Sequence, residues 1–321
     1  MSKPLCSEDF LMTAPSAGLH HITAICGDPA ENRRFFVDVL GLRLVKKTVN
    51  FDDPGTYHLY YGDEVGTPGS ALTFFAFSGA PRGQHGLGAA TEIAFAVPTD
   101  TLDFWQAHLA THGVDTQRIT RFNEEALCFT GPHGNSLALV ASDWAAAIPG
   151  RRGASVDSAY AIRGFHGVTL WIAELAPSAA VLEQVLGFQQ GGHDSDRVRF
   201  IADVGNTLGS IVDLRVDPDL ASARQGVGSV HHVAFRANDD AHENALRERL
   251  MEHGLQVTPT IDRQYFRSVY FREPAGVLFE IATDGPGFTI DEPVEALGTS
   301  LKLPPKYEKR RALIEQALFE L

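Results

Sequence analysis

The chain has 321 residues, of which 44% are hydrophobic and 21% charged, and its formal net charge is -13. A chain of this length can bury a large core and is expected to form two domains. The acidic excess argues against nucleic acid as a partner. The absence of a long apolar run or a signal sequence argues against a membrane partner and secretion, so we expect a cytoplasmic protein.

Cysteine usage is consistent with that compartment. The chain has three cysteines, Cys6, Cys26 and Cys128, an odd number that cannot all pair within the chain. Their spacing is not that of a metal site. This predicts free thiols in a reducing environment.

The first predicted unit opens with a strand over Leu19–Cys26 and a helix over Pro29–Leu40. Asp28 suits the N-cap, Pro29 suits the first helical position, and Gly41 permits the left-handed residue that ends the helix. Three further strands follow, so we interpret the unit as βαβββ.

The same order returns three times along the chain, with a nearly constant separation between the first strand and the glycine that ends the helix. The strand, helix and glycine of these units are Thr91–Val97, Leu102–His112 and Gly113; Gly164–Ile172, Ser178–Leu186 and Gly187; and Ser229–Arg236, His242–His253 and Gly254.

One such unit cannot cover both faces of its curved sheet, so units must pair around a cleft. We therefore predict an α+β fold in which four βαβββ modules pair into two half-barrel domains, residues 1–150 and 151–285. The Ala-, Gly-, Pro- and Arg-rich segment Ser142–Ser158 is the expected linker. Residues 286–321 are predicted to form a C-terminal extension, with a helix near Glu308–Leu321 that buries Leu313, Ala317 and Leu321.

Two first strands carry paired histidines, His20-His21 in the first unit and His231-His232 in the fourth. Neighbouring side chains on a strand point to opposite faces, so one histidine of each pair faces the cleft, and alternation alone does not choose which. Glu280 lies in an apolar strand, where a buried carboxylate needs a cationic partner or a metal.

Two imidazoles and one carboxylate match the facial triad of non-haem Fe(II) oxygenases. A single histidine pair is more often an ordinary packed strand feature, but recurrence at equivalent positions favours a metal site. Only units one and four assemble this triad. The positions equivalent to Glu280 hold Thr73, Ala138 and Asp213, and those equivalent to His232 in units two and three hold Glu92 and Gly167.

The chain resembles the hydroquinone-type ring-cleaving dioxygenases of the vicinal oxygen chelate superfamily over nearly its whole length. The segments that carry the resemblance are Leu19–Thr23, Tyr57–Tyr61, Gly66–Gly69, Gly164–His166, Val230–Ala234, Arg263–Arg272, Gly276–Glu280 and Gly287–Thr289.

The resemblance implies the vicinal oxygen chelate fold and a metal site in which His21, His232 and Glu280 are the ligands. It implies that His20, Thr23, His231, Arg263 and Tyr270 surround that site as catalytic residues. Without the resemblance, we would interpret Tyr270 as an ordinary strand tyrosine and Arg263 as a solvated loop charge. The implied cofactor is Fe(II), although Mn(II) prefers similar ligands.

The implied partners are a small aromatic substrate and O2, with ring opening to an unsaturated acid. Rival readings are a catechol extradiol dioxygenase, another enzyme of the superfamily such as a glyoxalase or a thiol-to-epoxide transferase, and a binder without metal. Thr73 stands where a glyoxalase would carry a second glutamate. The sequence leaves open whether His58 or His166 lines the pocket, and a homo-oligomer is compatible with it.

Overall fold

The computed structural model describes residues 14–202 and 207–321, so Cys6 lies outside the described residues. The described chain forms two eight-stranded sheets. As predicted, Cys26 and Cys128 are free thiols. Among the described residues, no helix combines the length and apolar character needed to cross a membrane.

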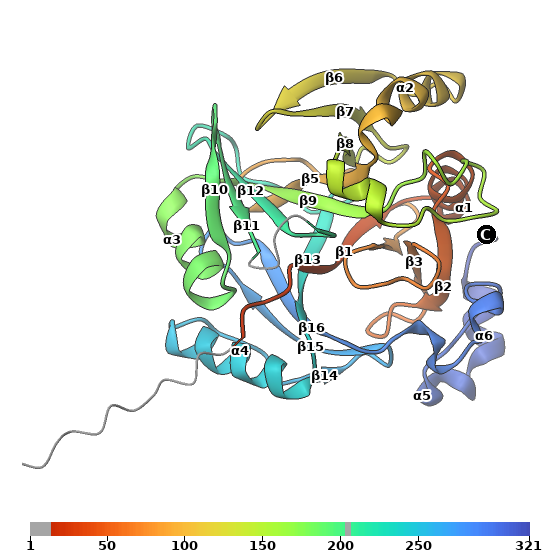
Figure 1. Ribbon diagram of the computed structural model, residues 1–321. Coiled ribbons are helices and arrows are strands. Elements are labelled where there is room, and N and C mark those ends of the chain that lie inside the picture. The colour runs from red at the N-terminus through yellow and green to blue at the C-terminus, as the bar shows by residue number, and fades with distance from the viewer. Residues whose placement is uncertain (1–13, 203–206) are drawn as a thin grey trace, which may run out of the picture.

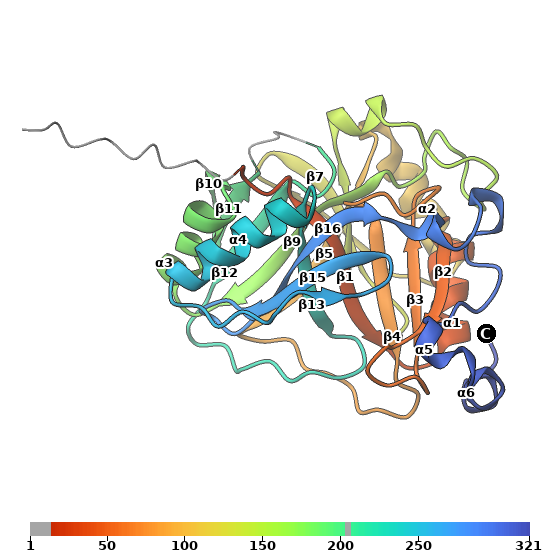
Figure 2. The ribbon, with the colours of Figure 1, turned by 90° about the horizontal axis from the view of Figure 1, so that it is seen from below.

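The first sheet joins unit one to unit four in the order β14-β15-β16-β13-β1-β4-β3-β2 (Figures 1 and 2). The two units meet where β1 pairs antiparallel with β13. Unit one contributes β1 (Leu19–Cys26), β2 (Arg43–Val49), β3 (Tyr57–Gly62) and β4 (Ala71–Ala76), and unit four contributes β13 (Val230–Ala237), β14 (Ile261–Asp262), β15 (Phe266–Arg272) and β16 (Leu278–Pro286).

The second sheet joins unit two to unit three in the order β10-β11-β12-β9-β5-β8-β7-β6. Here β5 and β9 form the antiparallel junction. Unit two contributes β5 (Ala89–Val97), β6 (Thr116–Arg121), β7 (Glu124–Thr130) and β8 (Ser136–Ala141), and unit three contributes β9 (Gly164–Ile172), β10 (Gln189–Asp194), β11 (Arg197–Ile201) and β12 (Ile211–Val216).

The four predicted βαβββ modules are confirmed, but the sheets do not follow the division expected at residue 150. Each sheet takes one module from residues 1–150 and one from residues 151–285. The predicted linker leads from β8 to β9, which belong to the same sheet. Spacing along the chain identifies modules, whereas their pairing depends on which strand edges match in space. The division into two domains at residue 150 remains a prediction.

Each module carries one helix between its first and second strands. Asp28 caps the first helix as predicted, accepting hydrogen bonds from the amides of Ala30 and Glu31. The glycines predicted to end the helices all have φ between 72° and 79°, a conformation that glycine adopts without steric cost. The helices are α1 (Pro29–Arg33) with a π-helical turn over Arg34–Val39, α2 (Leu102–Thr111), α3 (Leu175–Ala180) with a π-helical turn over Val181–Val185, and α4 (Asp240–Glu252).

The two faces of the first sheet have different partners. Phe36, Phe74 and Phe235 are fully buried in the main core, which contains residues of all four modules. On the other face, Tyr60, Ala234 and Ala282 belong to a separate buried cluster. Because strand side chains alternate, this second face lines the cleft of the half-barrel.

The C-terminal extension lies against the β2 edge of the first sheet (Figures 1 and 2). Lys46 on β2 is fully buried and pairs with Asp291 and Glu292 of the extension. Such a cation leaves water only when it is paired. The extension holds single 3-10 turns at Phe288–Ile290 and Val294–Ala296 and the helices α5 (Pro305–Glu308) and α6 (Arg311–Ala317).

The predicted buried face of the terminal helix is wrong. Leu313 is 64% exposed and Ala317 is exposed, whereas Ile314 is buried against Val49 and Leu303. The predicted long helix is divided into α5 and α6. Leu321, also predicted to be buried, lies beyond α6 and is partly buried against the main core.

Candidate metal centre

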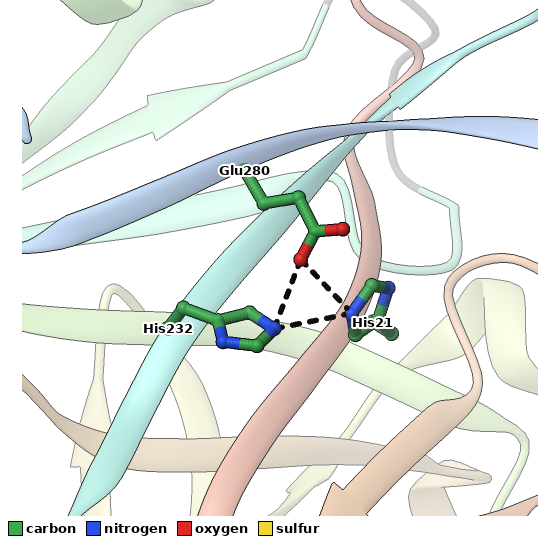
Figure 3. A group of neighbouring side chains, drawn as sticks. All are labelled: His21, His232 and Glu280. Atoms are coloured by element: carbon green, nitrogen blue, oxygen red, sulfur yellow. Dashed lines mark hydrogen bonds and ion pairs between the residues drawn. The ribbon is translucent and has the colours of Figure 1, made fainter. Parts of the chain in front are cut away.

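Three neighbouring strands of the first sheet carry the predicted ligands on one face. His21 lies on β1, His232 on β13 and Glu280 on β16. In the ladders, Ala234 lies opposite His21 on one side and Glu280 on the other. Since alternate residues share a face, His232 joins them. The three side chains point toward one another from strands at opposite ends of the chain (Figure 3).

The facing atoms lie close together and are shielded from solvent. Nε2 of His232 lies 2.9 Å from Oε2 of Glu280, and Nε2 of His21 lies 3.3 Å from the same oxygen. The two Nε2 atoms are 3.3 Å apart. All three residues are at most 4% exposed. Despite these contacts, Oε2 of Glu280 accepts no hydrogen bond from residues 14–202 and 207–321.

This spacing fits a shared metal ion. Bonds of about 2.1 Å at right angles place neighbouring ligand atoms about 3 Å apart. Within residues 14–202 and 207–321, His21, His232 and Glu280 form the one group of metal-ligand side chains close enough to hold a common ion. The geometry therefore provides three ligand atoms for one ion.

The hydrogen bonds of His20 determine which nitrogen of His21 carries a hydrogen. Nε2 of His20 lies 3.1 Å from the carbonyl oxygen of Thr283, so this nitrogen must donate. In a neutral His20 ring, Nδ1 must then accept, and its partner at 2.9 Å is Nδ1 of His21. Nδ1 of His21 is therefore protonated, and in the neutral ring Nε2 carries the lone pair. This lone pair and the carboxylate oxygen of Glu280 are donor atoms that a metal cation binds.

The charges of the buried groups match the ligand state. Burial and the neighbouring His21 hold the pKa of His20 well below its usual value. Burial also lowers the pKa of His232, an effect that Glu280 opposes. Burial alone would raise the pKa of Glu280, but positive charge on His21 and His232 brings it well below its usual value. A metal ion bound to the two imidazoles would supply the same positive charge, and an ionised carboxylate is the form that binds metal.

His231 repeats the relationship of His20 to His21. Its Nδ1 lies 2.8 Å from Nδ1 of His232. Burial and His232 lower the pKa of His231 to about 3. His231 borders a hollow of about 160 Å³, and His20 borders another of about 270 Å³. Each ligand histidine therefore has a neighbouring histidine with a lowered pKa that borders a hollow, although His20 itself is only 4% exposed.

Tyr270 and Arg263 support the remaining carboxylate oxygen. The hydroxyl of Tyr270 donates to Oε1 of Glu280 over 3.0 Å, and Nε of Arg263 donates to that hydroxyl over 3.1 Å. Burial and Glu280 raise the pKa of Tyr270, so it remains a phenol. Nη1 of Arg263 also pairs with Asp52 at the surface.

Thr23 and His58 occupy the unit-one half of the cleft. Thr23 lies opposite His232 in the β1–β13 ladder and bonds through its hydroxyl to Thr73 over 2.8 Å. Nε2 of His58 lies 2.8 Å from the same Thr73 hydroxyl, and its Nδ1 lies 2.9 Å from the hydroxyl of Tyr60. His58 therefore belongs to this cleft. Neither Thr73 nor Tyr60 was predicted as a site residue, although Tyr60 and Thr73 are paired in the ladder as Tyr270 and Glu280 are.

The second sheet fills its equivalent positions with ion pairs. Arg199 binds Asp213 through two hydrogen bonds of 2.8 and 2.9 Å, and Arg121 pairs with Glu92. His166 lies here and contacts Glu124 at 3.0 Å, remote from the His21 cluster. Guanidinium groups thus balance the carboxylates that a metal would balance in the first sheet.

The largest hollow, of about 970 Å³, lies elsewhere. Its lining includes Arg34, Phe35, His112 and Thr116, and none of the predicted site residues. We therefore base the functional assignment on the converging ligand atoms and not on cavity size.

Comparison with known proteins identifies the family. The model of the Glyoxalase/Bleomycin resistance protein/Dioxygenase superfamily matches residues 18–139 and 164–281. The chain is 43% identical over 307 residues to the Bacillus subtilis (strain 168) protein named "Putative ring-cleaving dioxygenase MhqO", covering 96% of this chain and 97% of that protein. It is 33% identical over 300 residues to the "Chlorohydroquinone/hydroquinone 1,2-dioxygenase" of Sphingobium indicum (strain UT26S), covering 91% and 92%.

Solved structures agree with this assignment. A crystal structure of a "putative dioxygenase" from Bacillus subtilis subsp. subtilis str. 168 superposes with a TM-score of 0.91 at 42% identity, covering 96% of this chain and 98% of that one. Glyoxalase I from Zea mays shares the fold alone, with a TM-score of 0.62 at 14% identity over 83% of this chain and 92% of that one. The family model and the near full-length relatives show that the chain belongs to the Glyoxalase/Bleomycin resistance protein/Dioxygenase superfamily.

Proposed function

We propose that the protein is a non-haem Fe(II)-dependent ring-cleaving dioxygenase that acts on hydroquinone-type aromatics with O2. The observation that carries the proposal is the convergence of His21, His232 and Glu280, whose facing atoms lie within 3.3 Å of one another. Relatives over nearly the full length are named for ring cleavage and for hydroquinone as a substrate. Mn(II) prefers similar ligands, so the donor atoms indicate a divalent metal ion, and the choice of iron follows from the family.

When bound, iron supplies electron transfer between the aromatic and O2 and stabilises oxyanions. In unit one, Thr73 stands in place of a second carboxylate, and its uncharged side chain supplies no fourth acidic ligand. This arrangement favours a dioxygenase over a glyoxalase with four protein ligands.

His231 is the residue that we propose moves protons. Its Nδ1 is engaged by His232, whereas its Nε2 forms no hydrogen bond within the described part of the chain. Both nitrogens of His20 are used, by His21 and by Thr283. We therefore assign proton exchange with substrate hydroxyls to His231 and orientation of His21 to His20.

Tyr270 and Arg263 hold the carboxylate in a fixed orientation. Tyr270 occupies Oε1 of Glu280, which leaves Oε2 for the metal. Arg263 donates to Tyr270 and thereby directs the tyrosine hydrogen toward Glu280. Residues that bind a ligand in this way tune its orientation and basicity.

Oxygen uptake tests the proposal. Protein purified without oxygen is analysed for metal, loaded with Fe(II), and supplied with O2 and a panel of hydroquinones and catechols. We expect uptake with hydroquinones and a ring-opened acid as product, and none with Glu280→Gln. Uptake restricted to catechols would support the extradiol reading instead. Bound Fe(II) without any oxygen uptake would contradict a dioxygenase.

The cytoplasmic location and the oligomeric state stay predictions.

A further inference from the structure

The two halves of the metal-bearing cleft are built alike but carry different chemistry. In unit four, Tyr270 lies opposite Glu280 in the β15–β16 ladder. In unit one, Tyr60 lies opposite Thr73 in the β3–β4 ladder. Tyr60 and Thr73 are therefore the counterparts of Tyr270 and the Glu280 carboxylate, and they form an uncharged wall of the cleft in unit one.

That wall contains a continuous chain of hydrogen bonds. It runs from the hydroxyl of Tyr60 to Nδ1 of His58 over 2.9 Å, and from Nε2 of His58 to the hydroxyl of Thr73 over 2.8 Å. It continues from Thr73 to the hydroxyl of Thr23 over 2.8 Å. All four residues are at most 9% exposed. Thr23 ends the chain beside the ligands, because it lies two residues after His21 and opposite His232.

Proton counting permits three arrangements of this chain. Burial holds the pKa of His58 well below its usual value, so the ring is neutral and has one donor and one acceptor. Each hydroxyl carries one hydrogen and can accept two. In the forward direction Tyr60 donates to His58, His58 to Thr73 and Thr73 to Thr23, which leaves the Thr23 hydrogen unused. In the reverse direction the Tyr60 hydrogen is unused, and when Thr73 accepts from both His58 and Thr23 the Thr73 hydrogen is unused.

In each arrangement the unused hydrogen has no acceptor within residues 14–202 and 207–321. An unmet buried donor is costly. An anionic oxygen bound beside Thr23 would supply the missing acceptor and thereby select the forward direction. The hydroxyl of Tyr60 then fixes the Nε2–H form of His58.

We propose that His58 is a positioning residue, held in one tautomer by Tyr60, that turns the Thr23 hydroxyl toward the anionic oxygen of a bound phenolate. This deepens the proposed function and rests on it for the choice of ligand. Its chemical class is an aryl oxyanion next to the metal ligands.

Binding of 4-nitrophenolate to the full-length zinc-loaded protein tests the inference without turnover. A hydrogen bond to a charged group contributes enough that we expect about 10-fold weaker binding in Tyr60→Phe and in Thr23→Val. Because Tyr60 acts through Thr23, the double variant should bind no more weakly than Thr23→Val. The matched control is Tyr61→Phe, whose buried hydroxyl has no partner and lies in the main core. The affinity of Tyr61→Phe for 4-nitrophenolate should be within about twofold of that of the unmodified protein.

Additive losses in the double variant, unchanged binding in Tyr60→Phe, or no binding to the unmodified zinc protein would each overturn the inference. Nitrogen-15 spectra of labelled histidines, with His58 assigned from His58→Gln, should show Nε2–H on addition of the phenolate. An Nδ1–H form would also overturn it. If phenolate binding behaves as expected but the iron protein takes up no oxygen, the proposed function fails and this inference stands.

Discussion

The hydroxyl of Tyr270 donates a 3.0 Å hydrogen bond to Oε1 of Glu280, the carboxylate oxygen that does not face the two imidazoles. The other oxygen, Oε2, accepts no hydrogen bond from the described part of the chain and contacts His21 and His232. The tyrosine therefore divides the carboxylate into one oxygen held by protein and one left for a metal.

Replacing Tyr270 by phenylalanine should weaken metal binding. Loss of a hydrogen bond to a ligating group typically costs 10- to 100-fold in affinity, so we expect about 10-fold weaker Fe(II) binding in an anaerobic titration. Tyr61→Phe removes a buried hydroxyl without a partner and should leave the affinity unchanged. Equal affinity in Tyr270→Phe and the unmodified protein would show that this hydrogen bond does not position the carboxylate.

Arg263→Lys should lower kcat without releasing the metal. Lysine cannot reproduce the Nε donor that reaches Tyr270 together with the Nη1 contact to Asp52. We expect a fall of about 10-fold in kcat, equivalent to roughly 1.4 kcal/mol. The control is the surface partner Asp52, which is 74% exposed. The kcat of Asp52→Asn should stay within about twofold of that of the unmodified protein. Similar losses in both variants would mean that the surface ion pair, and not the contact with Tyr270, is responsible.

Much of the fold was predictable because its signals are local. The strands Leu19–Cys26 and Gly164–Ile172 have the predicted bounds. The glycines at 41, 113, 187 and 254 all adopt positive φ, as expected for residues that end helices. Pairing of unit one with unit four was not predictable from spacing. It depends on β1 and β13 matching as antiparallel edges, although 211 residues separate His21 from His232.

The paired histidines and Glu280 were identifiable from the sequence because their residue types are unusual in apolar strands. His58 and Tyr60 gave a weaker signal, since β3 is buried almost throughout and its pattern does not reveal which face meets the cleft. The predicted buried face of the terminal helix was wrong for a related reason. Its apolar residues fit a single long helix, but the helix is divided into α5 and α6, and Ile314 is buried where Leu313 is exposed.

The ion pairs of the second sheet should make stability depend on pH. Burial alone would raise the pKa of Glu124, but hydrogen bonds from His166 and Arg199 lower it to about 2. A lowered carboxyl pKa adds stability above the unfolded value near 4.5, and this stability is lost as the pH falls toward 2. Glu124→Gln should therefore cost on the order of 2 kcal/mol at pH 7.

Urea unfolding at several pH values between 7 and 3 checks this expectation. The difference between the unmodified protein and Glu124→Gln should stay constant down to about pH 5 and shrink below it. Glu125→Gln is the control, because Glu125 pairs with Arg118 at the surface and should contribute under about 1 kcal/mol. A difference for Glu124→Gln that is the same at pH 7 and pH 3 would exclude a role of its charge.

Phe288 should couple the C-terminal extension to the stability of the first sheet. Its ring is 5% exposed and lies 5.0 Å from the ring of Tyr60 and 5.2 Å from that of Tyr265. Phe288→Ala should lower the free energy of unfolding by about 3 kcal/mol, as expected for a large cavity. Phe319→Ala, at a ring that is 60% exposed, should change it by under about 0.5 kcal/mol. Equal effects in urea unfolding would mean that Phe288 does not anchor the extension.

The number of Fe(II) ions bound per chain tests the metal centre most directly. The measurement compares anaerobic titrations of the unmodified protein, Glu280→Gln, and Glu92→Gln, which alters a ligand-equivalent position of the second sheet where Arg121 already pairs the carboxylate. The account predicts one ion in the unmodified protein, one in Glu92→Gln and none in Glu280→Gln. An ion retained by Glu280→Gln, or lost from Glu92→Gln, would contradict it.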